Sequence, residues 1–185
     1  CSYIANGVAL TLKAKEFSTT GPITIGTVAA IRKEKNIPRL VRAFAVASQQ
    51  ADLRLIIVGD GPELSAVKLL VSELNLDSMV TFTGYQKKPT ELLAQFDLFA
   101  LSSDTEQLPI AMLEAMAAGL PVVATEVGDV SSIFANATDS YTAKINDAAF
   151  TSALLLAIAT RSHWPDIGAH NRQIIDNEYA IAPMW

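Results

Sequence analysis

The sequence predicts an α/β fold of the Rossmann type, in which a parallel β-sheet carries helices on both faces. Short apolar segments alternate with longer segments whose apolar residues recur at helical spacing, and a few Gly, Pro or Asp residues join them. The segment Leu53–Val58 is apolar at all but one position, as is typical of a strand that is covered on both faces. The chain has 185 residues, which fits one domain of ordinary size.

Five apolar segments are expected to form the sheet, each bounded by turn residues. In chain order they are Ile23–Val28, Leu53–Val58, 79–83, Leu98–Leu101 and Val122–Thr125. The spacing of apolar residues predicts helices after the first two strands, around 40–44 and 64–74. Pro38, Pro62 and Pro89 are each expected in the first turn of a helix, where proline costs no backbone hydrogen bond.

The pattern is less regular after the fifth strand. We expect a loop at Gly128 and a short strand pair near Ile133 and Tyr141. Two further helices are expected, over about 148–160 and about 165–179.

The composition excludes several classes of function. Lys and Arg number 14 against 19 Asp and Glu, a net charge of -5, which argues against a nucleic-acid-binding protein. Cys1 is the only cysteine, so an internal disulfide framework is excluded and a reducing, cytoplasmic setting is expected. The longest stretch without a charge, 17–31, contains Gly21, Pro22 and Gly26 and is not a membrane-spanning helix. The chain begins without Met or a signal-like segment, so a piece of a longer product is expected.

Common ligand-binding motifs are incomplete or absent. Gly59 and Gly61 form G-x-G, but Leu64 stands where the third glycine of a dinucleotide-binding fingerprint belongs, so binding of NAD is disfavoured. The sequence contains no P-loop and no G-x-S-x-G motif, which argues against a P-loop NTPase and an esterase. The two histidines, His163 and His170, lie in a polar region and are expected on the surface rather than in a metal site.

The loops that follow the strands are where a ligand is expected, because open parallel sheets bind ligands at the carboxyl ends of their strands. These loops are 29–36, 59–62, 84–88, 102–109 and 126–129. They hold five of the 14 basic residues, namely Arg32, Lys33, Lys35, Lys87 and Lys88. Together with free helix N-termini, these cations predict an anionic ligand, with phosphate the expected group.

Glu114 is the most unusual residue of the chain. The segment LPIAMLEAMAAGL, 108–120, is apolar on all sides apart from Glu114, which predicts a buried helix that carries one carboxylate. Removing a carboxylate from water without partners is costly or raises its pKa, so a ligand-binding role is favoured over a tolerated ion pair or a place at a rim. Two adjacent hydroxyl groups would suit such a carboxylate.

Glu106 lies eight residues before Glu114, which places one carboxylate at the mouth of the helix and the other about two turns inside. Spacing alone leaves a second interpretation open, a solvated loop acid beside Asp104. Lys35, within RKEK, also has two interpretations, a ligand-binding cation or part of a solvated turn.

Four segments match a known family in order and spacing. They are IANGV (4–8), VGDGPE (58–63), FTGY (82–85) and EQLPIAMLEAMAAGLPVVATEVGD (106–129). They resemble the nucleotide-sugar-binding C-terminal half of family 4 retaining glycosyltransferases, which have the two-domain GT-B fold. The resemblance implies that 1–22 are a linker strand and connector from a missing N-terminal domain, and that 23–185 form the nucleotide-sugar donor-binding domain.

The resemblance also implies roles for individual residues. Lys35 and Glu106 would be the catalytic residues, since Lys35 would offset charge on the leaving diphosphate and Glu106 would hold hydroxyls of the donor sugar. Glu114 would accept hydrogen bonds from the ribose hydroxyls. The other residues implied in donor binding are Gly59, Tyr85 and Gln86 beside the base, and Gln107, Leu108, Pro109 and Ile110 at the helix mouth. Backbone N–H groups there would hold the phosphates, although Pro109 has none to give.

The sequence departs from the family pattern at two points. Ala30 stands where most members carry an arginine that pairs with the diphosphate, and one hypothesis is that Arg32 or Lys33 supplies this charge. The letters EQLP, 106–109, replace the E-G-F-G of many members, and the bulkier side chains are expected to narrow the donor pocket.

The function implied by the resemblance is that of a glycosyltransferase of the hexosyltransferase type. It would transfer a sugar from a nucleotide-diphosphate sugar, such as a UDP- or GDP-sugar, to an acceptor with retention of configuration, and no cofactor or metal ion is implied. Because the acceptor domain is missing, the 185 residues alone are expected to bind nucleotide diphosphate weakly and to be inactive. The full-length enzyme would be cytoplasmic, with a peripheral place at the inner membrane face.

Two alternatives are left open. One is half of a sugar-nucleotide epimerase with the same architecture, and the other is a degenerate module that binds nucleotide without catalysis, which Ala30 favours. A phosphoacceptor receiver domain is disfavoured because the first strand ends in Thr27, Val28 and Ala29 rather than in an acidic pair. The motifs do not identify the base, the sugar or the acceptor.

Overall fold

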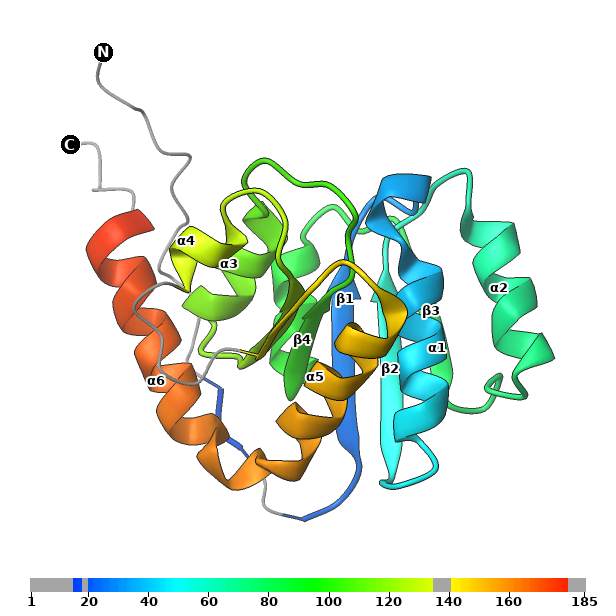
Figure 1. Ribbon diagram of the computed structural model, residues 1–185, viewed down its shortest axis with the longest axis horizontal. Coiled ribbons are helices and arrows are strands. Elements are labelled where there is room, and N and C mark those ends of the chain that lie inside the picture. Colours follow the sequence, from blue (N-terminus) through cyan, green and yellow to red (C-terminus); the bar gives the residue numbers. More distant parts are fainter. Residues whose placement is uncertain (1–14, 18–19, 135–140, 180–185) are drawn as a thin grey trace.

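A parallel sheet of six strands forms the centre of the computed structural model, which describes residues 15–17, 20–134 and 141–179 (Figure 1). The strands are β1 (Ile23–Val28), β2 (Leu53–Val58), β3 (Val80–Gly84), β4 (Leu98–Leu101), β5 (Val122–Thr125) and β6 (Tyr141–Ala143). Their order is β3-β2-β1-β4-β5-β6, and every neighbouring pair is parallel. The strand order reverses between β1 and β4, so the sheet has a topological switch point there.

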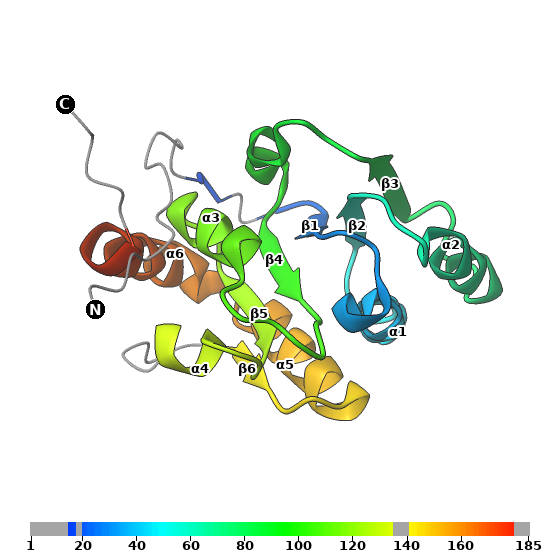
Figure 2. The ribbon, with the colours of Figure 1, turned by 90° about the horizontal axis from the view of Figure 1, so that it is seen from above.

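Helices connect the strands and cover both faces of the sheet, which confirms the predicted Rossmann-like fold. They are α1 (Ile37–Ala47), α2 (Leu64–Glu73), α3 (Ile110–Ala117), α4 (Val130–Ile133), α5 (Asp147–Ala159) and α6 (Trp164–Ile174), with short 3-10 segments η1 (Lys33–Lys35), η2 (Pro89–Gln95) and η3 (Arg161–His163) and a π-helical segment, η4 (Ile175–Tyr179). Seen from above, α1 and α5 lie on one face of the sheet and α3 on the other (Figure 2). None of the described helices is long and apolar enough to cross a membrane.

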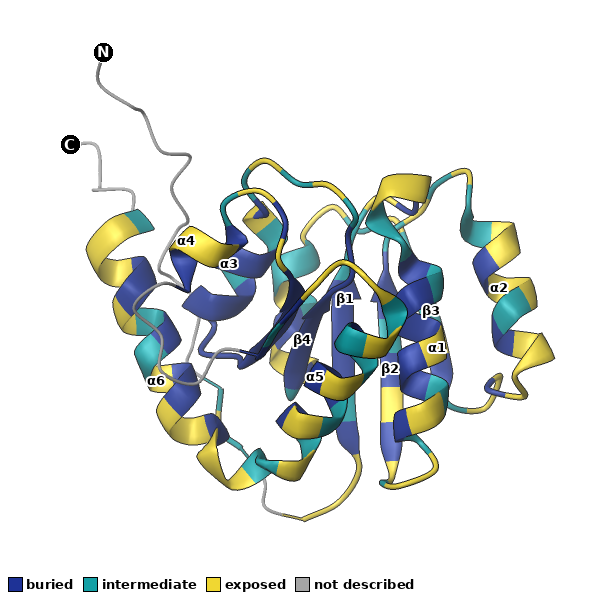
Figure 3. Cartoon of the chain, in the orientation of Figure 1, coloured by how far each residue is buried: buried dark blue, intermediate teal, exposed yellow. Residues whose placement is uncertain are grey.

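The apolar core has one part on each face of the sheet. Phe44 of α1 and Leu154 of α5 belong to the first part, and Met112 of α3 belongs to the second. The neighbouring β4 residues Leu98 and Phe99 are both fully buried but point into different parts. This is what a strand covered on both faces requires, and β4 is accordingly buried at every position, as is the neighbouring β5 (Figure 3).

Most of the expected elements are confirmed. The strands β1, β2, β4 and β5 have the expected bounds, and β3 begins one residue later than expected. The two C-terminal helices also form, although the second ends in the π-helical segment.

The strand pair expected near Ile133 and Tyr141 is only half right. Val130 and Ile133 are both buried on the α3 side of the core, and a spacing of three residues on one face is that of a helix, so this segment forms α4. Tyr141 does begin a strand, β6, but its partner is Val123 of β5.

Two further expectations need correction. Pro38 lies in the first turn of α1 and Pro89 begins η2, but Pro62 lies in a turn before α2, whose N-cap is Glu63. The helix predicted over 108–120 is shorter, because α3 begins only after Pro109. Most of the expected linker, 1–22, lies outside the described residues.

Candidate functional site

A pocket of about 520 Å³ opens at the carboxyl ends of β1, β2 and β4, beside the switch point. Parallel sheets bind ligands at this place because the chain leaves the two central strands toward opposite faces and opens a crevice between them. Nine of the ten expected site residues line the pocket, namely Lys35, Gly59, Tyr85, Gln86, Glu106, Leu108, Pro109, Ile110 and Glu114. Gln107, the tenth, is exposed and does not line it.

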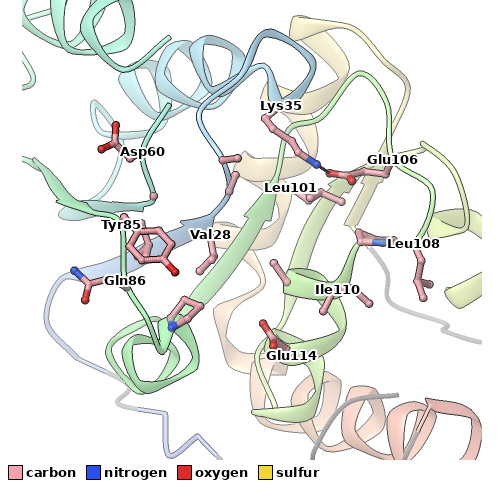
Figure 4. A pocket seen from close by; sticks show the side chains of 17 residues that line it. Val28, Lys35, Asp60, Tyr85, Gln86, Leu101, Glu106, Leu108, Ile110 and Glu114 are labelled. Atoms are coloured by element: carbon pink, nitrogen blue, oxygen red, sulfur yellow. Dashed lines mark hydrogen bonds and ion pairs between the residues drawn. The ribbon is translucent and has the colours of Figure 1, made fainter. Parts of the chain in front are cut away.

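Lys35 and Glu106 meet on one wall of the pocket (Figure 4). Lys35 Nζ donates to Glu106 Oε1 at 2.7 Å, and Ser103 Oγ donates to the same oxygen at 2.7 Å. The side chain of Glu106 is only 10% exposed, so the interpretation as a solvated loop acid is wrong. The interpretation of Lys35 as part of a solvated turn is also wrong, because its ammonium group is paired and faces the pocket.

Local structure explains where Lys35 points. Lys35 ends η1, and Asn36 follows it in the left-handed conformation with φ 40°, which asparagine tolerates better than most residues. The Asn36 side chain then caps α1 by accepting a hydrogen bond from the backbone N–H of Arg39. The chain therefore turns sharply between Lys35 and α1, with the lysine on the pocket side.

Glu114 lies in the second turn of α3 and lines the same pocket (Figure 4). It is half-buried, and no residue in the described ranges forms an ion pair or a side-chain hydrogen bond with it. Burial raises the pKa of its carboxyl above the ordinary value. The prediction of a solitary carboxylate on an apolar helix is thus confirmed, and the carboxylate faces the ligand space instead of an ion-pair partner.

The first turn of α3 also faces the pocket. Its N-cap is Pro109, which offers no side-chain cap. Leu108 and Ala111 line the pocket, and their backbone N–H groups donate to no acceptor in the described part of the chain. The N–H of Ile110, by contrast, donates to the carbonyl of Leu108 at 3.0 Å, so the expectation that it is open to a phosphate does not hold for this structure.

The other cations of the loops lie outside the pocket. Arg32 and Lys33 are exposed and line a separate pocket of about 180 Å³, and Lys87 and Lys88 are exposed as well. Of the five basic residues expected around the ligand, the structure therefore places only Lys35 there. The hypothesis that Arg32 or Lys33 replaces the arginine missing at position 30 finds no support in this arrangement.

Acids outnumber cations in the lining. The described lining holds three acids, Asp60, Glu106 and Glu114, against the one cation Lys35, and Asp60 is a charged residue that the sequence motifs did not single out. Its position directly after Gly59, at the end of β2, was the available signal. Carboxylates accept hydrogen bonds from hydroxyl groups, whereas Lys35 and the α3 N-terminus attract anions. The pocket is therefore built for a ligand that carries both hydroxyl groups and a negative charge.

Close backbone contacts hold the pocket loops. Gly59 has φ 135°, and a Cβ atom there would lie 1.9 Å from the carbonyl oxygen of Ala29. Gly128 has φ 52°, and a Cβ atom there would lie 2.3 Å from the carbonyl oxygen of Glu106. Larger residues do not fit at either place without movement of the loops. Across the described residues, no group of three or more His, Cys, Asp or Glu side chains is arranged to hold a metal ion.

The family of the chain follows from comparison with known proteins. The family model described as "Glycosyl transferases group 1" matches residues 9–174, and the chain belongs to this family. It is 36% identical over 120 residues to N-acetyl-alpha-D-glucosaminyl L-malate synthase of Bacillus anthracis, which covers 65% of this chain and 32% of that protein. The chain thus spans about a third of the length of that relative.

Solved structures show the same fold. A mutant of S. aureus TarM, crystallised with Fondaparinux, alpha-GlcNAc-glycerol and UDP, superposes with a TM-score of 0.82 at 22% identity, over 95% of this chain and 36% of that one. The C-terminal domain of LpcC, a glycosyl transferase group 1 family protein of Francisella tularensis, superposes with a TM-score of 0.82 at 21% identity, over 95% of this chain and 100% of that domain. The fold is that of glycosyltransferases of the GT-B type.

Proposed function

We propose that this chain is the C-terminal, donor-binding domain of a family 4 retaining glycosyltransferase, and that the pocket holds a nucleotide-diphosphate sugar such as a UDP- or GDP-sugar. Its likeness to the whole of a solved C-terminal domain from the same family supports the placement. The presence of UDP in the similar TarM structure supports the class of ligand.

One observation carries the proposal, the position of Glu114 relative to Lys35. The unpaired carboxylate of Glu114 and the ammonium group of Lys35 line one pocket. The first turn of α3 lines it as well. A nucleotide diphosphate offers matching groups, since two ribose hydroxyls can donate to Glu114 while the phosphates meet Lys35 and the amides of Leu108 and Ala111. The base would then lie near Tyr85, which is 74% exposed at the opposite wall.

In the proposed reaction, this domain contributes charge and orientation. Lys35 stabilises the negative charge that grows on the diphosphate as the bond to the sugar breaks, and Glu106 orients the sugar through its hydroxyl groups. The departing diphosphate accepts the proton of the acceptor hydroxyl, so these residues need not act as a general base. We propose that the acceptor binds to an N-terminal domain outside these 185 residues, which alone would not transfer sugar.

Calorimetric titration of the 185-residue chain with UDP, GDP, ADP and CDP tests the proposed ligand class. We expect one of them to bind with a Kd of about 10 μM to 1 mM, with or without a chelator, and we expect Glu114→Ala to weaken binding about tenfold or more. Glu73→Ala is the matched control, since Glu73 is an exposed acid at the end of α2 and does not line the pocket. Failure of all four nucleotides to bind, or an unchanged affinity of Glu114→Ala, would contradict the proposal.

Product analysis of the full-length protein tests the reaction. A glycosyltransferase releases nucleoside diphosphate together with a glycosylated acceptor that retains the anomeric configuration of the donor. Inversion at that carbon, or sugar transfer by the 185 residues on their own, would overturn this part of the proposal.

A further inference from the structure

Arg39 of α1 is a buried cation that does not line the pocket. It is 5% exposed, and it is the one charged residue that is buried within 15–17, 20–134 and 141–179. A buried guanidinium group is stable only where acceptors surround it. Its contacts therefore show what it holds together.

The guanidinium group of Arg39 joins three segments. Nη1 donates to the carbonyl oxygen of Ser102 at 2.9 Å and lies 2.7 Å from Asp104 Oδ1, while Nε donates to Asp147 Oδ1 at 3.1 Å. Ser102 and Asp104 belong to the loop between β4 and α3, which also carries Glu106. Asp147 begins α5.

The same loop is attached to the segment that carries Lys35. Ser102 Oγ donates to the carbonyl oxygen of Lys35 at 3.0 Å, and the backbone N–H of Asp104 donates to the carbonyl oxygen of Glu34 at 2.8 Å. Asn36 Nδ2 donates to Asp104 Oδ2 at 3.0 Å. Arg39 thus contacts Ser102 and Asp104, the two residues that bind the loop carrying Glu106 to the segment carrying Lys35.

We propose that Arg39 is a positioning residue that fixes Lys35 and Glu106 relative to each other, and thereby shapes the sugar end of the donor site. The proposal rests on the proposed function only for the identity of the ligand. The planar fork of arginine suits this task, because one side of it meets the Ser102 and Asp104 loop while the other meets Asp147. Lysine has the charge but cannot reach both sides with fixed geometry.

If Arg39 had a purely structural role and only held α1 against α5, loss of Arg39 and loss of Arg42 would affect the pair of Lys35 and Glu106 alike. Arg42 is the matched control, since it lies one turn further along α1 and its Nε donates to Asp147 Oδ2 at 2.7 Å. Its side chain is 46% exposed, and no hydrogen bond or ion pair joins it to the Ser102 and Asp104 loop within the described residues. Arg42→Ala therefore removes one of the two arginine contacts with Asp147 of α5 and leaves the contacts of the Ser102 and Asp104 loop in place.

The first measurement needs no ligand. The coupling free energy between Lys35 and Glu106 is obtained from a double-mutant cycle of Lys35→Met and Glu106→Gln in urea unfolding, carried out in the wild-type, Arg39→Met and Arg42→Ala chains. We expect the coupling to fall by at least about half with Arg39→Met and to stay unchanged with Arg42→Ala. Equal coupling in all three backgrounds would overturn the proposal.

The second measurement uses the ligand, at a temperature where every variant is folded. The ratio of affinities for the nucleotide-diphosphate sugar and the free nucleotide diphosphate reports on the contact of Glu106 with the sugar. We expect Arg39→Met to lower this ratio about fivefold or more, Arg39→Lys to restore part of it, and Arg42→Ala to leave it within about twofold. An unchanged ratio in Arg39→Met would overturn the proposal.

The two measurements separate failure of the proposal from failure of the proposed function. If the wild-type chain binds no nucleotide diphosphate, the proposed function fails, and the coupling between Lys35 and Glu106 still decides the role of Arg39. If the Arg39→Met chain does not fold, Asp104→Ala decides it, because the Asp104 side chain is 41% exposed and its removal takes away its contacts with Arg39 and Asn36, leaving Arg39 bound to the loop through the Ser102 carbonyl alone. We expect the same loss of coupling in Asp104→Ala, and its absence would overturn the proposal.

Discussion

Lys35 Nζ lies 2.7 Å from Glu106 Oε1, so the cation that lines the pocket is already paired with an acid of the same pocket. A diphosphate that approaches Lys35 must therefore share it with Glu106. A sugar attached to the diphosphate would compensate, because its hydroxyl groups can donate to Glu106. If the pocket holds a nucleotide-diphosphate sugar as proposed, the pair would distinguish the complete donor from the nucleotide left after transfer.

Glu106→Gln is predicted to increase the affinity for free nucleoside diphosphate. Removal of the carboxylate leaves Lys35 to the phosphates and removes one repulsive charge, and we expect a gain of about threefold to tenfold. The advantage of the nucleotide-diphosphate sugar over the free nucleotide should shrink at the same time. Calorimetry with both ligands measures both effects.

Asp60→Asn is the control for the Glu106→Gln substitution. Asp60 lines the same pocket, but no ion pair joins it to Lys35 within the described residues. Its replacement should change the two affinities by a similar, smaller factor. A weaker binding of free nucleotide by Glu106→Gln would show that Glu106 does not compete with the phosphates.

Nucleotide affinity is predicted to fall at low pH because of Glu114. Burial raises the pKa of this carboxyl, and its ionised form accepts hydrogen bonds from two ribose hydroxyls more strongly than the protonated form, which carries an O–H donor itself. As the pH falls through the raised pKa, the protonated fraction grows and the affinity drops by up to about tenfold per pH unit. Titrations across the acidic range measure the slope, and Glu114→Gln should bind weakly with a flatter profile. Equal slopes in the two chains would contradict the assignment of Glu114.

Glu114→Gln is also predicted to stabilise the fold at neutral pH. A carboxyl whose pKa is higher in the folded than in the unfolded chain adds stability when protonated, and that stability is lost as the pH rises through the raised pKa. At neutral pH the charged Glu114 therefore opposes folding. We expect Glu114→Gln to raise the Tm by about 1 to 3 °C at pH 7 and to lose this advantage near pH 4. Thermal scans at the two pH values test it, and a lower Tm at pH 7 would show that Glu114 has stabilising contacts.

The sequence was sufficient to predict those features that repeat or stand out along the chain. The strands that are apolar on both faces had clear bounds, and Glu114 was conspicuous as the one charge in an apolar helix. A short segment such as Val130–Ile133 fits a strand or a helix by composition, and only packing against the α3 side of the core decides for α4.

Contacts between distant segments could not be predicted in this way. Lys35 and Glu106 are 71 residues apart, and their meeting depends on two loops that extend from neighbouring strands. Arg39 gave no signal at all, because an arginine in an amphipathic helix is normally exposed. Its burial follows from the acceptors that Ser102, Asp104 and Asp147 bring to it from other parts of the chain.

Ala30→Arg is predicted to strengthen nucleotide diphosphate binding. Ala30 is exposed and lines the pocket, where the described lining offers one cation against three acids. A guanidinium group there would pair with the phosphates and offset part of the acidic excess. We expect a gain of about tenfold, measured by calorimetry at low and at moderate salt, with the larger gain at low salt. Ala30→Gln, which adds a polar side chain without charge, is the control and should gain much less.

Gly128→Ala is predicted to damage both the fold and the proposed donor site. Gly128 has φ 52°, where alanine costs about 1 to 2 kcal/mol, and its Cβ would lie 2.3 Å and 2.5 Å from the carbonyl oxygens of Glu106 and Gln107. Both obstacles are backbone atoms, so the loop that carries Glu106 must move. We expect a loss of about 2 to 4 kcal/mol in the free energy of unfolding and a reduced affinity for the nucleotide-diphosphate sugar.

Gly21→Ala is the control that separates the conformational cost from the steric clash. Gly21 has φ 88°, but nothing lies within 4 Å of its Cβ position. Its replacement should therefore cost only the conformational part and leave the affinity for the nucleotide-diphosphate sugar unchanged. Equal losses in urea unfolding of the two variants would show that the contact between Gly128 and the Glu106 loop is not tight.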